Sequence, residues 1–234
     1  MRSRNKIAIY TAVIGDRDNL TEPQFIPEGC DFICFTDQPF SSNVWKIIRV
    51  KPLDSDPCRS AKIYKILPHH YLSEYEYSVW IDGNIVLCAD ITPIINEYLV
   101  KNDIAFFKHP EGRNCIYEEA EACIRLNKDD PEVINDQIEF YRKQEYPEKN
   151  GLVSCGIIFR RNIPEVNKIN EDWWKIIRKY SRRDQLSFNY VAFKNRLSYS
   201  VIDDNVRSNK YFKMVSHKKK KKGLLNRLRK LVGN

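Results

Sequence analysis

The feature that most constrains the fold is an alternation of strand-like and helix-like segments in the first half of the chain. A helix is expected from Pro57 to about Leu67, with Asp56 as its N-cap. Strands that alternate with helices predict an α/β fold with a mostly parallel central sheet. Runs rich in β-branched and aromatic residues predict strands over 6–15, 31–37, 45–50, 77–87 and 103–109.

The second half adds helices around one further buried strand, 152–159. With 234 residues, the chain is expected to form one domain over 1–217, which buries roughly 70–75% of its surface. Helical spacing of apolar residues predicts helices over 116–127, 131–144, 164–180 and 184–197, and short strands are expected near 199–203 and 211–215.

Composition excludes several classes of protein. Hydrophobic residues make up 42% and charged residues 30% of the chain, which is typical of a soluble globular domain. No apolar run reaches about 18 residues, so no transmembrane helix is expected, and we expect no signal peptide. Seven scattered cysteines without a CxxC pair or zinc spacing predict reduced, mostly buried thiols and a cytoplasmic protein.

The positive charge is concentrated in one C-terminal segment. The chain has a net charge of +8, and residues 218–234 hold eight basic residues and no acidic one. Leu224, Leu225, Leu228 and Leu231 share one helical face there, which predicts a basic amphipathic segment that binds an anionic membrane surface. A disordered solubilising tail is the alternative. Nucleic-acid binding is not expected, because no aromatic residue is interleaved with the lysines.

A polar triplet interrupts the most strand-like segment of the chain. Asp82-Gly83-Asn84 follows the apolar run YSVWI, and ligands of parallel α/β sheets bind at the carboxyl ends of strands. One carboxylate and one amide oxygen suit a hard divalent cation, whereas an Asx turn between two short strands is the alternative.

Six short strings follow one another along the chain: IAIYTAVIG, FICFTD, DPCRSAKIYKILPH, YSVWIDGNI, SCGIIFRRN and RRDQLSFNYV. Their order and spacing resemble a known family. It is a glycosyltransferase-like family that includes bacterial polysaccharide-locus proteins and plant Golgi proteins linked to cell-wall mucilage, and the resemblance covers roughly 6–217. It implies a GT-A-like nucleotide-binding sandwich and a hexosyltransferase-like enzyme.

The resemblance also implies a metal site. Asp82 and Asn84 stand where the family of folds carries a DxD motif that binds manganese or magnesium and grips a nucleotide diphosphate. Asn84 replaces the second aspartate, so a metal-independent variant stays open. His217 is the implied further metal ligand, and an exposed histidine at the start of the basic segment is the alternative.

The first two strands are implied to form the nucleotide pocket. Thr11, Ala12 and Val13 are expected near the base. Asp37 is expected to bind the base or the ribose, unless it is only a turn residue before Gln38.

Further contacts to the donor are implied on one helix and one strand. Arg59 and Lys62 are expected to offset the diphosphate charge, unless they lie on a solvated helix face. Ser154 and Gly156 resemble the small residues that line the donor sugar.

Asp184 is the expected catalytic residue. If the enzyme inverts stereochemistry, this carboxylate would deprotonate the acceptor hydroxyl; if it retains, Asp184 would only position the sugar. The alternative is a capping box in which Ser181 is the N-cap and Asp184 is N3. The arginine pairs at 160–161 and 182–183 are further phosphate candidates, although such pairs are usually solvated.

Taken together with the residues, the resemblance implies a metal-assisted glycosyltransferase of polysaccharide biosynthesis. It would move a sugar from a nucleotide-sugar donor, with a UDP-sugar expected, to a surface-polysaccharide or lipid-linked glycan acceptor. It is expected in the cytoplasm, peripheral on the inner face of the membrane. Two other classes stay open: a non-catalytic nucleotide-sugar-fold module recruited to the membrane, and a hydrolase of a lipid amide. The hydrolase would need a nucleophile or an activated water, and neither a Ser-His-Asp arrangement nor an HExxH motif is found.

Overall fold

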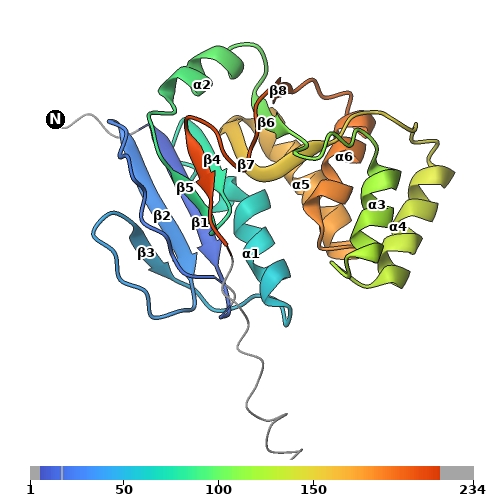
Figure 1. The fold of residues 1–234 in the computed structure, drawn as a ribbon, viewed down its shortest axis with the longest axis horizontal. Coiled ribbons are helices and arrows are strands. Elements are labelled where there is room, and N and C mark those ends of the chain that lie inside the picture. The colour runs from blue at the N-terminus through green and yellow to red at the C-terminus, as the bar shows by residue number, and fades with distance from the viewer. Residues whose placement is uncertain (1–5, 17, 217–234) are drawn as a thin grey trace, which may run out of the picture.

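A central sheet of seven strands, in the order β3-β2-β1-β4-β7-β6-β8, organises the chain (Figure 1). The computed structural model describes residues 6–16 and 18–216. The strands of this sheet are β1 (Ile7–Val13), β2 (Cys30–Thr36), β3 (Lys46–Arg49), β4 (Tyr77–Ile81), β6 (Ile104–Lys108), β7 (Val153–Arg161) and β8 (Ser200–Ile202).

Most neighbours in this sheet are parallel, as the sequence predicts. The pairs β1–β2, β1–β4, β2–β3 and β6–β8 are parallel, whereas β7 runs antiparallel to both β4 and β6. The carboxyl ends of β1, β4 and β6 therefore meet the amino end of β7 at one edge of the sheet. Every residue of β1 is buried, as expected of a strand covered on both faces.

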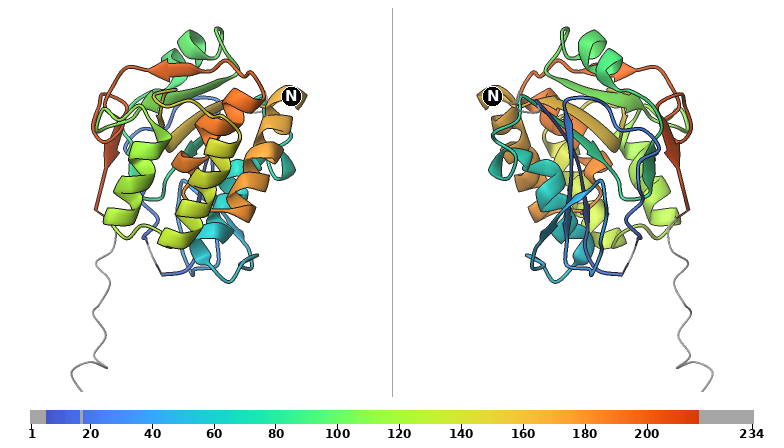
Figure 2. Two further views of the ribbon diagram at one scale, coloured as in Figure 1. Left: turned by 90° about the vertical axis from the view of Figure 1, so that its right-hand side faces the viewer. Right: turned by 90° about the vertical axis from the view of Figure 1, so that its left-hand side faces the viewer.

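Helices cover one face of the sheet, and α2 with a small second sheet covers the other. The first core contains side chains of α1, α3, α4, α5 and α6, and the second contains those of α2, β5 and β9. Figure 2 shows α3 to α6 gathered on one side of the sheet. The helices are α1 (Pro57–Ile66), α2 (Thr92–Tyr98), α3 (Ile116–Arg125), α4 (Pro131–Lys143), α5 (Pro164–Lys179) and α6 (Phe188–Lys194), with short 3₁₀ turns η1 (Pro68–His70) and η2 (Asp184–Leu186).

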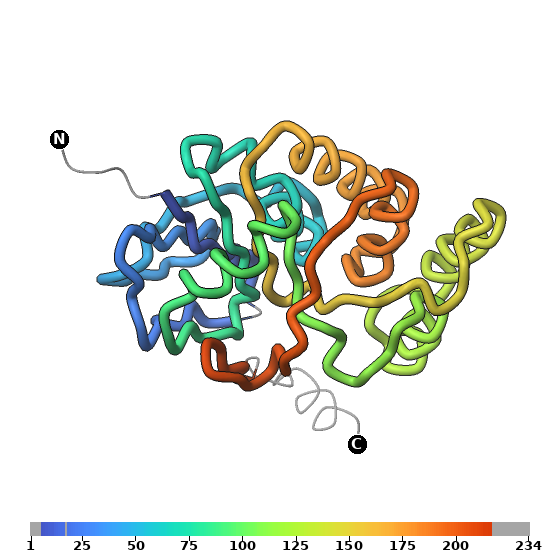
Figure 3. Tube along the Cα trace, turned by 90° about the horizontal axis from the view of Figure 1, so that it is seen from above, coloured from blue at the N-terminus to red at the C-terminus, as the bar shows by residue number. Residues whose placement is uncertain are grey.

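The last strands return to segments that lie far away in the sequence. β8 pairs with β6, and β9 (Phe212–Met214) pairs antiparallel with β5 (Ile85–Leu87) to form the second sheet. Figure 3 shows the orange and red end of the described chain lying against the green segments. This return brings Val215 beside Asn84, because the backbone N–H of Val215 donates to the Asn84 carbonyl over 2.8 Å.

Two local expectations differ from the structure. The predicted helix over 184–197 is divided, because η2 ends at Leu186 and α6 begins at Phe188. The capping box from Ser181 to Asp184 is absent, because η2 has Arg183 as its N-cap and no side-chain capping bond. The Ser181 hydroxyl instead donates to Asp129 over 2.7 Å and accepts from the Arg183 N–H over 3.1 Å. Helix α2 was not predicted, although a proline stands in its first turn as it does in α1. Within the described residues, no helix combines the length and the apolar composition needed to cross a bilayer.

Helix α1 begins as the sequence predicts. The Asp56 side chain accepts a hydrogen bond from the Cys58 N–H over 3.0 Å, and Pro57 occupies the first helical position. Asp56 also accepts from the Arg182 guanidinium over 2.8 Å, which joins this helix end to the loop before η2. Hydrogen bonds from Arg182 and Cys58 outweigh partial burial and lower the pKa of Asp56.

Asp56→Ala is expected to destabilise the protein more than Asp130→Ala. Asp130 is the matched N-cap of α4, and its side chain accepts from the Glu132 N–H over 2.9 Å. Loss of a cap alone costs about 1 kcal/mol, whereas Asp56→Ala also removes one of two carboxylate partners of Arg182, the other being Asp129. Urea denaturation measures both costs, and equal costs would contradict a structural role for the bond to Arg182.

Candidate active site

A cleft of about 390 Å³ opens where the carboxyl ends of the strands meet. Its size lies within the range typical of small-ligand sites. The cleft is lined from β1 by Ala12 and Val13, from α1 by Lys62, from the end of β4 by Asp82, Gly83 and Asn84, and from β7 by Ser154 and Gly156. The structure thus brings together most of the site residues that the sequence predicts.

Asp82 is held by two donors at its Oδ1 atom. The Trp80 indole N–H donates to Oδ1 over 2.7 Å, and the Lys65 ammonium donates to it over 2.9 Å. Lys65 is 1% exposed, whereas the Asp82 side chain keeps 38% of its surface exposed in the cleft. The indole and the ammonium therefore fix the carboxylate while its Oδ2 atom stays available.

The same lysine links Asp82 to Asp184. The Asp184 Oδ2 atom lies 2.7 Å from the Lys65 ammonium and 2.5 Å from the Lys62 ammonium. Two lysines one turn apart on α1 thus share one buried carboxylate of η2. We refer to Asp82, Lys65, Asp184 and Lys62 as the buried ionic chain.

The charges of the buried ionic chain disfavour Asp184 as a general base. Burial alone would raise the pKa of Asp184, but the Lys62 and Lys65 ammonium groups hold it well below its usual range. Burial alone would lower the pKa of Lys65, but the carboxylates of Asp184 and Asp82 raise it. A carboxylate that binds protons so weakly is a poor general base at neutral pH.

Gly83 and Asn84 continue the chain into β5. A Cβ atom on Gly83 would lie 3.1 Å from Val13 Cγ2, so a larger residue would crowd the end of β1. Asn84 is 5% exposed, and its side-chain amide nitrogen donates to the Val215 carbonyl over 3.1 Å. The pairing with Val215 fixes the side chain of Asn84, and its Oδ1 is the atom that can bind a cation.

Space remains next to the free oxygen of Asp82. A Cβ atom on Gly156 would lie 3.6 Å from Asp82 Oδ2 and 3.3 Å from Ile85 Cδ1, so glycine keeps this volume open. Asp82 Oδ2 and Asn84 Oδ1 are hard oxygen ligands, and Mg²⁺ or Mn²⁺ is commonly held by few protein ligands plus phosphate oxygens. These residues fit such a cation. His217, the further expected ligand, lies outside the described residues.

Two of the nucleotide-pocket candidates do not line the cleft. The Thr11 hydroxyl is buried and has no hydrogen-bond partner within the described chain, and it would lie 3.9 Å from a Cβ on Gly83. Asp37 accepts a hydrogen bond from the Gly15 N–H over 2.9 Å and from the Gln38 side chain over 2.8 Å. Asp37 thus fixes the turn after β1, where Gly15 has a φ of +70°.

Arg59 points away from the cleft, so its expected contact with a diphosphate is wrong for this structure. Its guanidinium donates to the carbonyls of Ile177, Arg178 and Tyr180 at the end of α5. The last carbonyls of a helix carry partial negative charge and have no partner within the helix. Arg59 satisfies them and ties α1 to α5, whereas Lys62, three residues later, faces the cleft.

The two arginine pairs, 160–161 and 182–183, also differ in whether they line the cleft. Arg182 and Arg183 line the cleft, and the Arg183 Nε–H is buried without a partner within the described residues. Arg160 is fully buried in the core, where it donates to the Tyr10 hydroxyl over 3.0 Å, and Arg161 lies 3.7 Å from Asp103. Only the later pair is placed to meet an anionic ligand.

The far rim of the cleft is an ionic cluster between two loops. Glu111 accepts from Arg113 over 2.7 Å and from Arg207 over 2.6 Å. These hydrogen bonds, that from Arg207 first, lower the pKa of Glu111 to about 2. Arg113 also donates to Glu119 over 2.7 Å, and Glu119 lies 3.4 Å from His109. The cluster joins the loop after β6 to the segment before β9.

Sequence reasoning missed Lys65 and the indole of Trp80. The signal for Lys65 was a charged residue between two apolar ones, Tyr64 and Ile66, and all three are buried in the structure. The signal for Trp80 was its place two residues before Asp82, on the same side of an extended strand.

Fold and cleft define an α/β protein with a partly basic ligand site at the carboxyl ends of its strands. The sequence model of one family, described as TOD1/MUCI70, glycosyltransferase-like domain, matches residues 1–222. The chain belongs to this family. The expected resemblance is thereby confirmed, and the strand pairings confirm the mostly parallel α/β architecture.

Two curated relatives from Arabidopsis thaliana are similar to the chain. "Probable hexosyltransferase MUCI70" is 26% identical over an alignment 241 residues long, and the alignment covers 89% of this chain and 42% of the relative. "Alkaline ceramidase TOD1" is 23% identical over an alignment 221 residues long, and the alignment covers 79% of this chain and 48% of the relative. The chain therefore spans less than half the length of these relatives.

Two solved structures are similar in shape. The glycosyltransferase GlyE of Streptococcus pneumoniae TIGR4 has a TM-score of 0.48 at 10% identity, over 86% of this chain and 46% of its own. The bifunctional glycosyltransferase WbbM has a TM-score of 0.49 at 11% identity, over 87% of this chain and 39% of its own.

Asp184→Asn is expected to cost about 3–5 kcal/mol of unfolding free energy, because Lys62 loses its carboxylate partner and Lys65 keeps only Asp82. The matched control is Asp172→Asn on α5, whose exposed partner Lys175 lies 2.8 Å away. That control is expected to stay within about 0.5 kcal/mol of the wild type. Chemical denaturation at neutral pH measures both.

A comparison of the wild type with Asp184→Asn at different pH values tests the pKa of Asp184. Because the pKa of this carboxyl is depressed in the folded state, the unfolded chain takes up the proton first, near its ordinary value of about 3.9. The stabilisation is therefore complete above about pH 4 and is lost as the pH falls further. The stability gap between wild type and Asp184→Asn should shrink below pH 4, and a constant gap would contradict the ion pairs.

Proposed function

We propose that this chain is a nucleotide-sugar-dependent glycosyltransferase that transfers a hexose from a nucleotide-sugar donor, a UDP-sugar, to a glycan. The observation that carries the proposal is the position of Asp82 at the carboxyl end of β4. It is exposed in a cleft and held by Lys65, in a chain of a glycosyltransferase-like family. Parallel α/β sheets bind their ligands at this edge.

The donor would lie across the ends of β1 and β4. Ala12 and Val13 would contact the nucleotide, with Thr11 beneath them as part of the strand that shapes the pocket. Ser154 and Gly156 would leave room for the sugar, since a Cβ at Gly156 would fill the space beside Asp82.

The charge on the diphosphate would be met by cations from two elements. Lys62 lies in the cleft on α1, and Arg183 lies there with a buried N–H that has no partner within the described chain. Asp82 and Asn84 would hold Mn²⁺ or Mg²⁺, and a bound cation of this kind neutralises the negative charge that develops on a leaving diphosphate. His217 would be a further ligand.

Asp184 acts in this proposal through the lysines. Its carboxylate fixes the ammonium groups of Lys62 and Lys65, and its depressed pKa leaves it ionised, so it positions positive charge at the donor site. If the reaction inverts and Asp184 is the base, the lysines must first move away from it.

The acceptor would be a surface polysaccharide or a lipid-linked glycan that enters past the ionic rim of Glu111, Arg113 and Arg207. Residues 218–234, which lie outside the described residues, would hold the protein on the inner face of the membrane. The enzyme would thus be cytoplasmic and peripheral.

Two other functions are separable by experiment. A module that binds a nucleotide sugar without turnover would share the cleft. Hydrolysis of a lipid amide is suggested by one relative, the alkaline ceramidase TOD1. A screen of nucleotide sugars for slow donor cleavage, run beside a ceramide substrate, separates the three because only a transferase releases the nucleotide diphosphate.

Titration calorimetry with UDP and GDP, with and without Mn²⁺, tests the donor site. The wild type should bind one nucleotide more tightly with Mn²⁺, and Asp82→Ala should remove that dependence because it deletes the charged ligand. Metal-dependent binding by Asp82→Ala equal to that of the wild type would contradict the assignment of Asp82.

Lys62→Met is expected to weaken nucleotide binding by roughly tenfold, the effect of losing one charge-assisted contact. Arg59→Met is the matched control from the same helix, and its nucleotide affinity should equal that of the wild type, because its guanidinium binds the end of α5. A larger loss in Arg59→Met than in Lys62→Met would reverse the two roles.

For the membrane proposal, liposomes that contain anionic lipid should carry the full chain in flotation. Replacing Lys218 to Lys222 by glutamine should reduce flotation strongly, since each cation near the surface contributes about 1 kcal/mol. Equal flotation of both proteins would contradict this proposal without affecting the donor site.

A further inference from the structure

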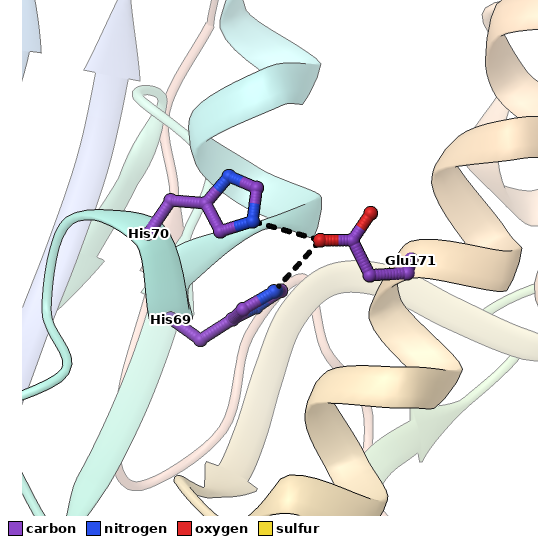
Figure 4. Close-up of side chains that lie close together, drawn as sticks. All are labelled: His69, His70 and Glu171. Atoms are coloured by element: carbon purple, nitrogen blue, oxygen red, sulfur yellow. Dashed lines mark hydrogen bonds and ion pairs between the residues drawn. The ribbon is translucent and has the colours of Figure 1, made fainter.

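Two histidines and one glutamate converge on the helical side of the molecule, outside the cleft (Figure 4). His69 and His70 are the last residues of η1, directly after α1, and Glu171 lies on α5. The Oε1 atom of Glu171 is 3.0 Å from His69 Nε2 and 2.7 Å from His70 Nε2. None of the three lines the candidate active site.

The chemistry of this cluster matches a borderline transition metal. Imidazole nitrogen and carboxylate oxygen are ligands that Zn²⁺ accepts, and two histidines with one glutamate form a known three-ligand set for it. Mg²⁺ and Ca²⁺ prefer all-oxygen sites, so the two imidazoles favour zinc over the cation expected at Asp82.

The geometry also fits. All three ligand atoms lie within 4.8 Å of one another. In a tetrahedron with bonds of about 2.0–2.1 Å, ligand atoms are separated by roughly 3.3 Å, so the two N–O separations of 3.0 and 2.7 Å need to open by about 0.3 and 0.6 Å. The side chain of His69 is 11% exposed, whereas those of His70 and Glu171 are 47% and 40% exposed. The open side would allow water to complete the coordination.

The cluster lies on the seam between α1–η1 and α5. Arg59 ties the start of α1 to the end of α5, and the cluster joins the residues after α1 to an earlier turn of α5. A metal at the cluster would thus hold the second end of this seam, four residues after Lys65.

We propose that His69, His70 and Glu171 form a binding site for one zinc-type divalent cation, separate from the donor site, which clips η1 to α5. Binding moves the proton of each neutral ring from Nε2, which faces Glu171, to Nδ1, so that both Nε2 atoms and the carboxylate ligate the cation and no proton is lost from the rings. The bound metal stabilises the folded chain, because the unfolded chain does not hold the three ligands together.

The test uses the full chain, stripped with a chelator and returned to buffer without phosphate. With zinc chloride alone, the melting temperature should rise by roughly 5–10 °C at a hundredfold excess over Kd. Cobalt chloride should give the visible absorption of a tetrahedral site. Elemental analysis after dialysis counts the bound zinc.

After dialysis, Glu171→Gln and His70→Ala should each hold one zinc fewer than the wild type. In titration, the zinc affinity of each variant should be lower by about tenfold or more. The isosteric Glu171→Gln keeps a hydrogen-bond acceptor for the histidines, and its metal-free melting temperature establishes that it is folded. Asp172→Asn on the same helix, Asp82→Ala in the cleft and His217→Ala should keep this zinc.

Unchanged zinc binding and melting temperature in Glu171→Gln would overturn the proposal and leave the cluster as a hydrogen-bonded seam. Loss of the zinc in Asp82→Ala or His217→Ala instead would assign the metal to the donor site. Because the readouts are affinity, absorption and stability, failure of this proposal leaves the glycosyltransferase proposal intact, and the reverse also holds.

Discussion

The candidate site depends on the buried ionic chain that runs from Asp82 through Lys65 and Asp184 to Lys62. Lys65 and Asp184 are almost fully buried, and an isolated charge in that environment would be strongly destabilising. Each charge is offset only because α1, η2 and the end of β4 meet at one place. The same contacts therefore hold the fold together at the cleft and determine which charges an incoming ligand meets.

In this arrangement, residues of the same charge that the sequence does not distinguish make different contacts. Arg59 and Lys62 lie three residues apart on one helix, yet Arg59 binds the carbonyls at the end of α5 and Lys62 faces the cleft. The two carboxylates also differ: that of Asp184 is enclosed by two ammonium groups, whereas that of Asp82 keeps one oxygen available. A site that places positive charge beside a partly exposed carboxylate would suit the diphosphate and the cation of the proposed donor.

Much of the fold was predictable because local patterns report it. Apolar runs located the strands of the central sheet, and Asp56 with Pro57 located the start of α1. The triplet Asp82-Gly83-Asn84 was found because polar residues directly after an apolar strand indicate a turn or a ligand site. Lys65 was missed because nothing near it in the sequence indicates a carboxylate partner, which comes from Asp184, more than a hundred residues later. The helix expected over 184–197 was only partly right, since Ser187 binds the Trp173 indole and the Asp184 carbonyl at the break.

The sequence by itself determined the alternation of elements, the mostly parallel sheet and the edge at which a ligand site forms. These follow from periodicity and capping, which depend on residues a few positions apart. Only the tertiary structure decided which charges are paired, which way Arg59 points, and that His69, His70 and Glu171 share one point in space. Ion pairs and metal ligands depend on distances of a few ångströms between side chains from different elements, and only the packing of α1, η1, η2 and α5 sets those distances.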